Sequence, residues 1–125
     1  MIVAVSVAAA GLDAALDPRF GRAAAFVFVN TETGECQEYA NPAMGASGGA
    51  GIQAAEWLVK QGAEAVISGA FGPNAYDVLA AAGVSMYRAT DGTATELIEK
   101  LKRNELDPVV GVSRGGRGRG RGRWG

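Results

Sequence analysis

The sequence predicts an α/β fold in which helices cover both faces of a mixed five-stranded sheet. Apolar runs of strand length alternate with segments whose apolar residues recur at helical spacing. A turn signal separates the second and third runs, which indicates an antiparallel hairpin. Helical segments separate the later runs, which indicates parallel strands joined by crossovers.

The N-terminal part of the chain contains three candidate strands. Residues 2–7 form a near-continuous apolar run, as expected for a central strand that is covered on both faces. A long loop over residues 11–22 separates this run from a second one at 24–29, which is rich in Phe and Val. Residues 31–34 are typical of a tight turn. Residues 35–39 then alternate between polar and apolar, which predicts an exposed edge strand.

Three helices are predicted after a small-residue loop over residues 41–51. Gly62 and Gly83 mark helix ends, and Pro73 suits the first position of a helix. Thr93 and Glu96 have the spacing of a capping box. The predicted apolar faces are Ile52, Ala55, Leu58 and Val59, then Ala75, Val78, Leu79 and Ala82, then Ala94, Leu97, Ile98 and Leu101.

Two short strands, at residues 65–68 and 84–87, complete the predicted sheet. The element order is then β-β-β-α-β-α-β-α. We expect the strand order 3-2-1-4-5, in which only strand two is antiparallel to the others. That is a ribonuclease-H-like arrangement.

The chain divides into an acidic body and a basic tail. Its 125 residues suit one domain, since domains most often have about 100–150 residues. Residues 1–113 carry 7 basic and 13 acidic side chains, whereas residues 114–125 carry five arginines and no acid. Six of those last twelve residues are glycine, which makes ordering costly in entropy. We predict a domain over residues 1–108 and a disordered Arg/Gly-rich tail over 109–125.

Several functional classes are excluded by what the chain lacks. It has one cysteine and no histidine, so disulfide frameworks, multi-cysteine metal sites and histidine-based triads cannot form within it. Residues 2–7 contain no acid, unlike the first strand of two-metal nucleases. No apolar run approaches the ~20 residues that cross a bilayer, and no basic region precedes residue 2. We expect a cytoplasmic protein that is not an enzyme.

Four loops should meet at one edge of the sheet, at residues 8–22, 41–51, 68–72 and 89–92. Parallel strands end at this edge, and ligands of open α/β sheets bind there. Three of the loops open directly into helices, whose N-termini offer free N–H groups and a partial positive charge. We therefore expect an anion at this rim.

Residues 47–51 and Arg22 are the first candidates for contact with that anion. Ser47, Gly48, Gly49 and Gly51 stand at a helix start, where glycine lets an anion approach backbone N–H groups closely. Arg22 would be the fixed cation. A purely structural alternative stays open for each feature. The glycines could serve only tight turns, and Arg22 could pair with Asp17 or Asp13 at the surface.

Two other features also leave alternatives open. Cys36 is expected just past the hairpin turn, at the end of the sheet opposite the rim, as a half-buried strand residue or as a thiolate ligand of a metal cluster. The tail could be a solvated extension, could bind RNA or DNA through phosphate contacts and stacking of Arg and Trp124, or could fold over an anionic rim ligand or a partner.

Four motifs together resemble the dinitrogenase iron–molybdenum cofactor biosynthesis family, the small NifX-like domain also found at the C-terminus of NifB-like proteins. They are residues 17–23 (DPRFGRA), 41–42 (NP), 48–52 (GGAGI) and 68–75 (SGAFGPNA). The resemblance covers roughly residues 1–107 and implies a ribonuclease-H-like fold without catalysis. It also implies binding or carriage of the iron–molybdenum cofactor or an iron–sulfur precursor. The site positions that it carries over are Phe20, Gly21, Arg22, Gly48, Gly49, Gly51, Gly69, Gly72, Pro73 and Asn74.

The leading hypothesis is a non-enzymatic accessory protein that carries an anionic metal cluster, or a related small anion, at the rim. Its partners would be that cargo and nitrogenase-maturation proteins, and it would not bind membranes. One alternative is a nucleic-acid-associated protein that acts through its tail. Another is a small-molecule or redox-linked regulatory domain that uses the same rim.

Overall fold

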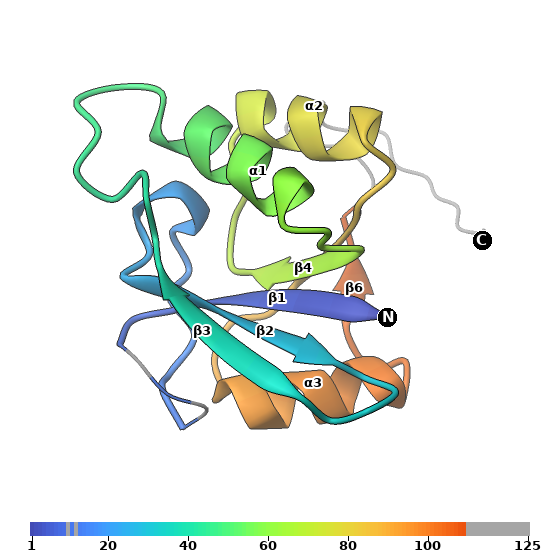
Figure 1. Cartoon of the computed structure of the whole chain (residues 1–125). Coiled ribbons are helices and arrows are strands. Elements are labelled where there is room, and N and C mark those ends of the chain that lie inside the picture. The colour runs from blue at the N-terminus through green and yellow to red at the C-terminus, as the bar shows by residue number, and fades with distance from the viewer. Residues whose placement is uncertain (10, 12, 110–125) are drawn as a thin grey trace.

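One mixed sheet runs through the protein, with the strand order β3-β2-β1-β4-β5-β6 (Figure 1). The computed structural model describes residues 1–9, 11 and 13–109. The strands are β1 (Ile2–Val7), β2 (Ala25–Asn30), β3 (Cys36–Ala40), β4 (Ala65–Ser68), β5 (Ser85–Arg88) and β6 (Asp107–Pro108). The helices are α1 (Ala50–Lys60), α2 (Pro73–Ala81), α3 (Ala94–Lys102) and a short 3-10 helix, η1 (Phe20–Arg22).

Strand directions place the ends of four strands at one edge of the sheet. β1 is antiparallel to β2 and parallel to β4, which is itself parallel to β5. β2 and β3 form the predicted antiparallel hairpin, in which Val29 pairs with Cys36. The predicted order of the first five strands and the antiparallel β2 are therefore confirmed. The carboxyl ends of β1, β3, β4 and β5 lie at the same edge.

The prediction of five strands is wrong, because β6 adds a sixth. β6 is antiparallel to β5, with Arg88 opposite Asp107 and Tyr87 opposite Pro108. The backbone N–H of Val109 then donates to the carbonyl of Met86 at 2.8 Å. A two-residue strand with a proline carries no strand signal in the sequence, and only an edge position tolerates that proline. The assignment to a ribonuclease-H-like fold stays a prediction.

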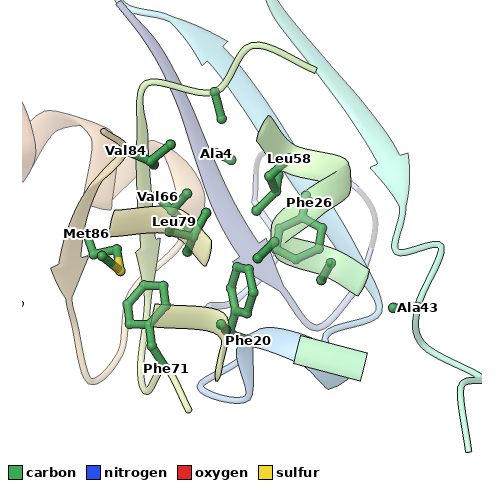
Figure 2. Close-up of a cluster of buried hydrophobic side chains, with 14 of the residues drawn as sticks. Ala4, Phe20, Phe26, Ala43, Leu58, Val66, Phe71, Leu79, Val84 and Met86 are labelled. Atoms are coloured by element: carbon green, nitrogen blue, oxygen red, sulfur yellow. The ribbon is translucent and has the colours of Figure 1, made fainter. Parts of the chain in front are cut away.

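Two apolar layers hold helices on opposite faces of the sheet, as predicted (Figure 1). Alternate residues of β1 point to opposite faces. Val3, Val5 and Val7 pack with α3, whereas Ala4 packs in the cluster that includes α1 and α2. Figure 2 shows this second cluster, in which Phe26 lies between Leu58 and Phe20, with the ring centres of the two phenylalanines 5.5 Å apart. β1 is thus buried on both faces.

Helix ends follow the sequence signals closely. Thr93 forms the predicted capping box, because its hydroxyl accepts from the N–H of Glu96 at 3.2 Å while its own N–H donates to the Glu96 carboxylate at 2.9 Å. Gly62 and Gly83 have positive φ just beyond α1 and α2. The buried face of α1 differs from the prediction, since it consists of Ala50, Ala54, Ala55 and Leu58. Ile52 and Val59 are only half-buried.

The C-terminal tail lies almost wholly outside the described residues. Of the predicted segment 109–125, only Val109 is described, and it packs against the α1/α2 cluster. The predicted disorder of the tail and its nucleic-acid contacts concern residues 110–125 and are not tested. In the described part of the chain, no helix is long and apolar enough to cross a membrane.

Candidate functional site

The segment between β1 and η1 is anchored to the sheet through Asp17. The N–H of Asp17 donates to the carbonyl of Ser6 at 2.9 Å, and the Ser6 hydroxyl lies 2.8 Å from the carbonyl oxygen of Asp17. The hydroxyls of Ser6 and Ser68 also lie 2.8 Å apart. All three residues are buried. These bonds thus fix the segment before η1 against the neighbouring strands β1 and β4.

The Asp17 carboxylate accepts hydrogen bonds from three donors of Arg19. Its Oδ1 accepts from the backbone N–H of Arg19 at 2.9 Å and from Nε at 3.1 Å, and its Oδ2 accepts from Nη2 at 3.1 Å. Burial opposes ionisation of Asp17, but the hydrogen bonds and the charge of Arg19 outweigh burial and lower the pKa of the carboxyl. The Arg19 side chain is 68% exposed, so its guanidinium is oriented yet open to solvent.

Two glycines let the rim loops touch backbone to backbone. A Cβ on Gly21 would lie 2.7 Å from the backbone nitrogen of Gly51, in the first turn of α1. A Cβ on Gly69 would lie 2.5 Å from Cα of Pro18. Real Cβ atoms do not approach so closely, so any larger residue would push these loops apart. The two glycines therefore set the spacing of the segments around α1 and α2.

These contacts enclose an open pocket of about 420 Å³ between η1 and the starts of α1 and α2. Arg19, Phe20 and Gly21 form one side. Residues 49–52 form a second side and residues 72–75, with Ala70, a third. Phe20 packs on Phe71 and Phe26, with ring centres 5.3 and 5.5 Å apart, so one wall of the pocket is rigid. None of the residues that line the pocket is acidic.

The pocket combines two positive helix ends with one cation. The residues before α1 and α2 are Gly49 and Gly72, and neither supplies a side-chain cap. Gly49 has a φ of 70°, a conformation that glycine adopts most readily. The first-turn N–H groups of both helices have no partner within their own helix. With Arg19 beside them, these groups favour a bound anion.

The predicted site residues fall into two groups. The pocket itself is lined by Phe20, Gly21, Gly49, Gly51, Gly72, Pro73 and Asn74. The other four positions lie outside that lining. Gly69 packs on Pro18, and Ser47 and Gly48 are exposed in the loop before α1. Nη1 of Arg22 donates to the carbonyls of Ala46 at 2.8 Å and Met44 at 3.3 Å, so Arg22 secures that same loop.

Sequence reasoning did not single out Arg19 or Asn41. Arg19, and not Arg22, pairs with Asp17. The spacing Asp-Pro-Arg was the available signal, since a buried aspartate commonly bonds the backbone two residues on. Asn41 is buried, and its amide donates to the carbonyls of Gly21 and Ala23 at 3.1 and 3.0 Å. It ties η1 to the end of β3.

Cys36 lies apart from this pocket. It is exposed on β3, which corrects the expectation of a half-buried residue, because no helix covers the edge where it stands. It lines a second pocket, of about 640 Å³, along the β2–β3 hairpin. Among the described residues, no three His, Cys, Asp or Glu side chains gather as a metal site would require.

Residues 1–104 match the protein family described as dinitrogenase iron–molybdenum cofactor. This chain belongs to that family. The matched residues include every strand except β6. They also include every residue that lines the pocket between η1 and the starts of α1 and α2, which we call the rim pocket.

Three individual proteins are similar to this chain, two in both sequence and fold and one in sequence. The structure of the apo form of the orange protein from Desulfovibrio gigas is 35% identical, with a TM-score of 0.84 over 88% of this chain and 93% of that one. A Thermotoga protein of the DUF35 family, described as a candidate NifB protein, is 31% identical, with a TM-score of 0.80 over 92% and 98%. The uncharacterized protein MJ0580 of Methanocaldococcus jannaschii is 30% identical over 95 residues, which is 74% of this chain and 80% of that one.

Proposed function

We propose that this protein is a non-enzymatic carrier of an anionic metal cluster, which is the iron–molybdenum cofactor or an iron–sulfur precursor. The observation that supports this function most strongly is the pocket in which two uncapped helix starts meet Arg19. Such a pocket favours anions, and the family's description names the iron–molybdenum cofactor, which is an anionic cluster. We also propose that nitrogenase-maturation proteins exchange this cargo with the carrier.

The cluster would be held through contacts to its outer atoms. The pocket offers no cysteine or histidine, which are the usual protein ligands of iron and molybdenum clusters. It offers instead the N–H groups of two helix starts, the guanidinium of Arg19 and the amide of Asn74. Cargo bound in this way keeps its own ligands and can be released without breaking a metal–protein bond. The solved orange protein is an apo form, and its 35% identity supports a role in holding a removable group.

The direct test of this site adds a carboxylate to it without disturbing the fold. A Cβ on Gly72 meets nothing within 4 Å, and Gly72 has an ordinary φ of −70°. Gly72→Asp should fold, because aspartate is a favoured residue at a helix N-cap. Its carboxylate would occupy the first-turn N–H groups and repel the cargo. We expect it to lose retention of isolated iron–molybdenum cofactor under anaerobic conditions.

Two further variants show whether a loss of cofactor retention comes from the added charge or from its position at α2. Gly45→Asp adds the same charge where a Cβ also meets nothing, outside the pocket, and should retain the cofactor. Gly72→Ser caps α2 without a charge and should show an intermediate loss. Equal retention by wild type, Gly72→Asp and Gly45→Asp would move the binding site away from α2.

A further inference from the structure

The pocket of about 640 Å³ along the β2–β3 hairpin has no part in the proposed carrier site. Its walls are partly apolar, from Ile2, Phe28 and Tyr39, and partly polar, from Glu35, Cys36 and Gln61. Tyr39 is half-buried and its ring packs edge-on against Phe28 and Trp57. The groove is therefore a surface with an aromatic wall and one carboxylate, that of Glu35, at its border.

The hairpin carries uncompensated negative charge. The hairpin, residues 25–40, holds three acids, Glu32, Glu35 and Glu38, and no basic residue. The N-terminal ammonium lies 3.8 Å from the Glu32 carboxylate. Within residues 1–9, 11 and 13–109, Glu35 and Glu38 have no cation within ion-pair distance. β3 is the uncovered edge of the sheet, so its outward backbone groups are also open to a ligand.

We propose that the Arg/Gly-rich segment 117–125 of the same chain docks in this hairpin groove. Its four arginines complement Glu35 in the groove and the other acids of the hairpin, and Arg guanidinium groups stack on aromatic rings such as that of Tyr39. Arginine alternates with glycine from 117 to 123, so an extended chain would place four guanidinium groups on one side. Trp124 follows directly and suits the apolar wall.

The end of the described chain lies within reach of this groove. β6 runs antiparallel to β5, so the chain at Val109 heads toward the end of the sheet where β1 begins. Ile2, at that end of β1, lines the groove. Five strand spacings separate β6 from β3, which is about 24 Å. The eight residues from Val109 to Arg117 span at most about 26–29 Å. Residues 117–125 are therefore the part of the tail that can reach the groove within one molecule.

Cys36 supplies the test, since it is the single cysteine, is exposed and lines the groove. A nitroxide on Cys36 of the full-length chain should attenuate the NMR signals of the Trp124 indole N–H and of the amides in 117–123. Glu35→Gln with Glu38→Gln should restore those signals. Asp77→Asn with Asp91→Asn changes the charge equally at exposed positions elsewhere and should not. Raising the salt to 1 M should also restore them, because charges more than about 3 Å apart are then largely screened from one another.

A second measurement avoids any label in the groove. Replacing all five tail arginines by glutamine in the full-length chain should shift the amide signals of residues 34–37, Asn30 and Gln61 and leave the rest of the domain unchanged. Undisturbed groove amides, together with an unattenuated Trp124 signal, would overturn the proposal. Attenuation that disappears on dilution with unlabelled protein would also overturn it, by placing the tail on a second copy. Groove signals that shift only when RNA is added would assign the tail to nucleic acid.

Discussion

Asp17 connects the sheet to the rim pocket through both its backbone and its side chain. The backbone bonds to Ser6 of β1, and the buried carboxylate holds Arg19 from three donors. A guanidinium fixed in this way needs to lose little side-chain entropy when it meets an anion. Asp17 is thus a positioning residue, whereas Arg19 is the residue that would contact the cargo.

The lowered pKa of Asp17 predicts a defined pH dependence of stability. A carboxyl whose pKa is lower in the native than in the unfolded state stabilises the fold above its unfolded pKa, about 3.9, and loses that contribution as the pH falls through the native pKa. As the pH falls from about 5 to about 2, the free energy of unfolding of Asp17→Asn should therefore decrease less than that of wild type. At pH 7 it should be less stable by about 1 kcal/mol, since Arg19 is exposed and water replaces part of the bond.

Chemical denaturation of both proteins across this pH range checks the prediction. The relevant quantity is the difference in free energy of unfolding between wild type and variant, because other carboxyls titrate equally in both. A difference that stays constant from neutral to acid pH would show that Arg19 does not stabilise the ionised Asp17.

Arg19 and Arg22 should differ in their effect on cargo binding. Arg19→Gln removes the cation that lines the pocket, and we expect about tenfold weaker retention of the iron–molybdenum cofactor. Arg22→Gln loosens only the loop that Arg22 secures through Ala46 and should have a smaller effect. Anaerobic titration of the two variants side by side gives the comparison. A larger loss in Arg22→Gln would place the site over the loop at residues 43–48.

At the scale of elements, the rim depends on segments that pack without side chains between them. η1 reaches the first turn of α1 at Gly21, and the β4–α2 turn reaches Pro18 at Gly69. α1 and α2 also lie close together, because a Cβ on Gly51 would lie 3.4 Å from the Cβ of Ala75, a van der Waals contact. The close approaches at Gly21 and Gly69 therefore set the positions of the helix starts, and not side chains that reach into the pocket.

Alanine at Gly69 or Gly21 should destabilise the fold by about 1–3 kcal/mol, because the added methyl overlaps backbone or ring atoms that cannot move freely. Thermal and chemical denaturation measure the loss. Gly45→Ala is the matched control, since a methyl there meets nothing within 4 Å. Unchanged stability in Gly69→Ala would mean that Pro18 can shift, and that the rim is less rigid than its geometry indicates.

Most elements could be predicted from sequence because their signals are local. The hairpin was indicated by residues 31–34, and α3 by the Thr93–Glu96 capping box. β6 could not be predicted, because it consists of two residues and exists only through its pairing with β5. The 3-10 turn of η1 was also missed. It is held by distant partners, since the side chain of Asn41 bonds the carbonyls of Gly21 and Ala23.

At the scale of the whole molecule, topology predicted where the site residues gather, but not which arginine faces the pocket. The parallel strands bring the glycine-rich loops to one edge, and seven predicted positions line one pocket there. Arg19 and Arg22 stand in the same loop, one turn apart, and composition cannot distinguish them. Only the burial of Asp17 decides that Arg19 is the one oriented beside the helix starts.

The two pockets divide the molecule into two ends. The rim pocket lies where the parallel strands end, whereas the hairpin groove includes Ile2, where β1 begins. An anionic cargo and a cationic tail would therefore bind at separate places. This separation predicts that changes to Glu35 leave cargo binding intact, so failure of either proposal can be recognised independently of the other.

The central claim is that the rim pocket holds an anionic metal cluster. The most direct test is an anaerobic titration of the full-length protein with isolated iron–molybdenum cofactor, followed by desalting and measurement of iron and molybdenum. We predict stoichiometric retention of both metals by wild type and loss of retention in Gly72→Asp. Folded wild-type protein that retains neither metal would contradict the carrier function, while leaving the family and the fold unchanged.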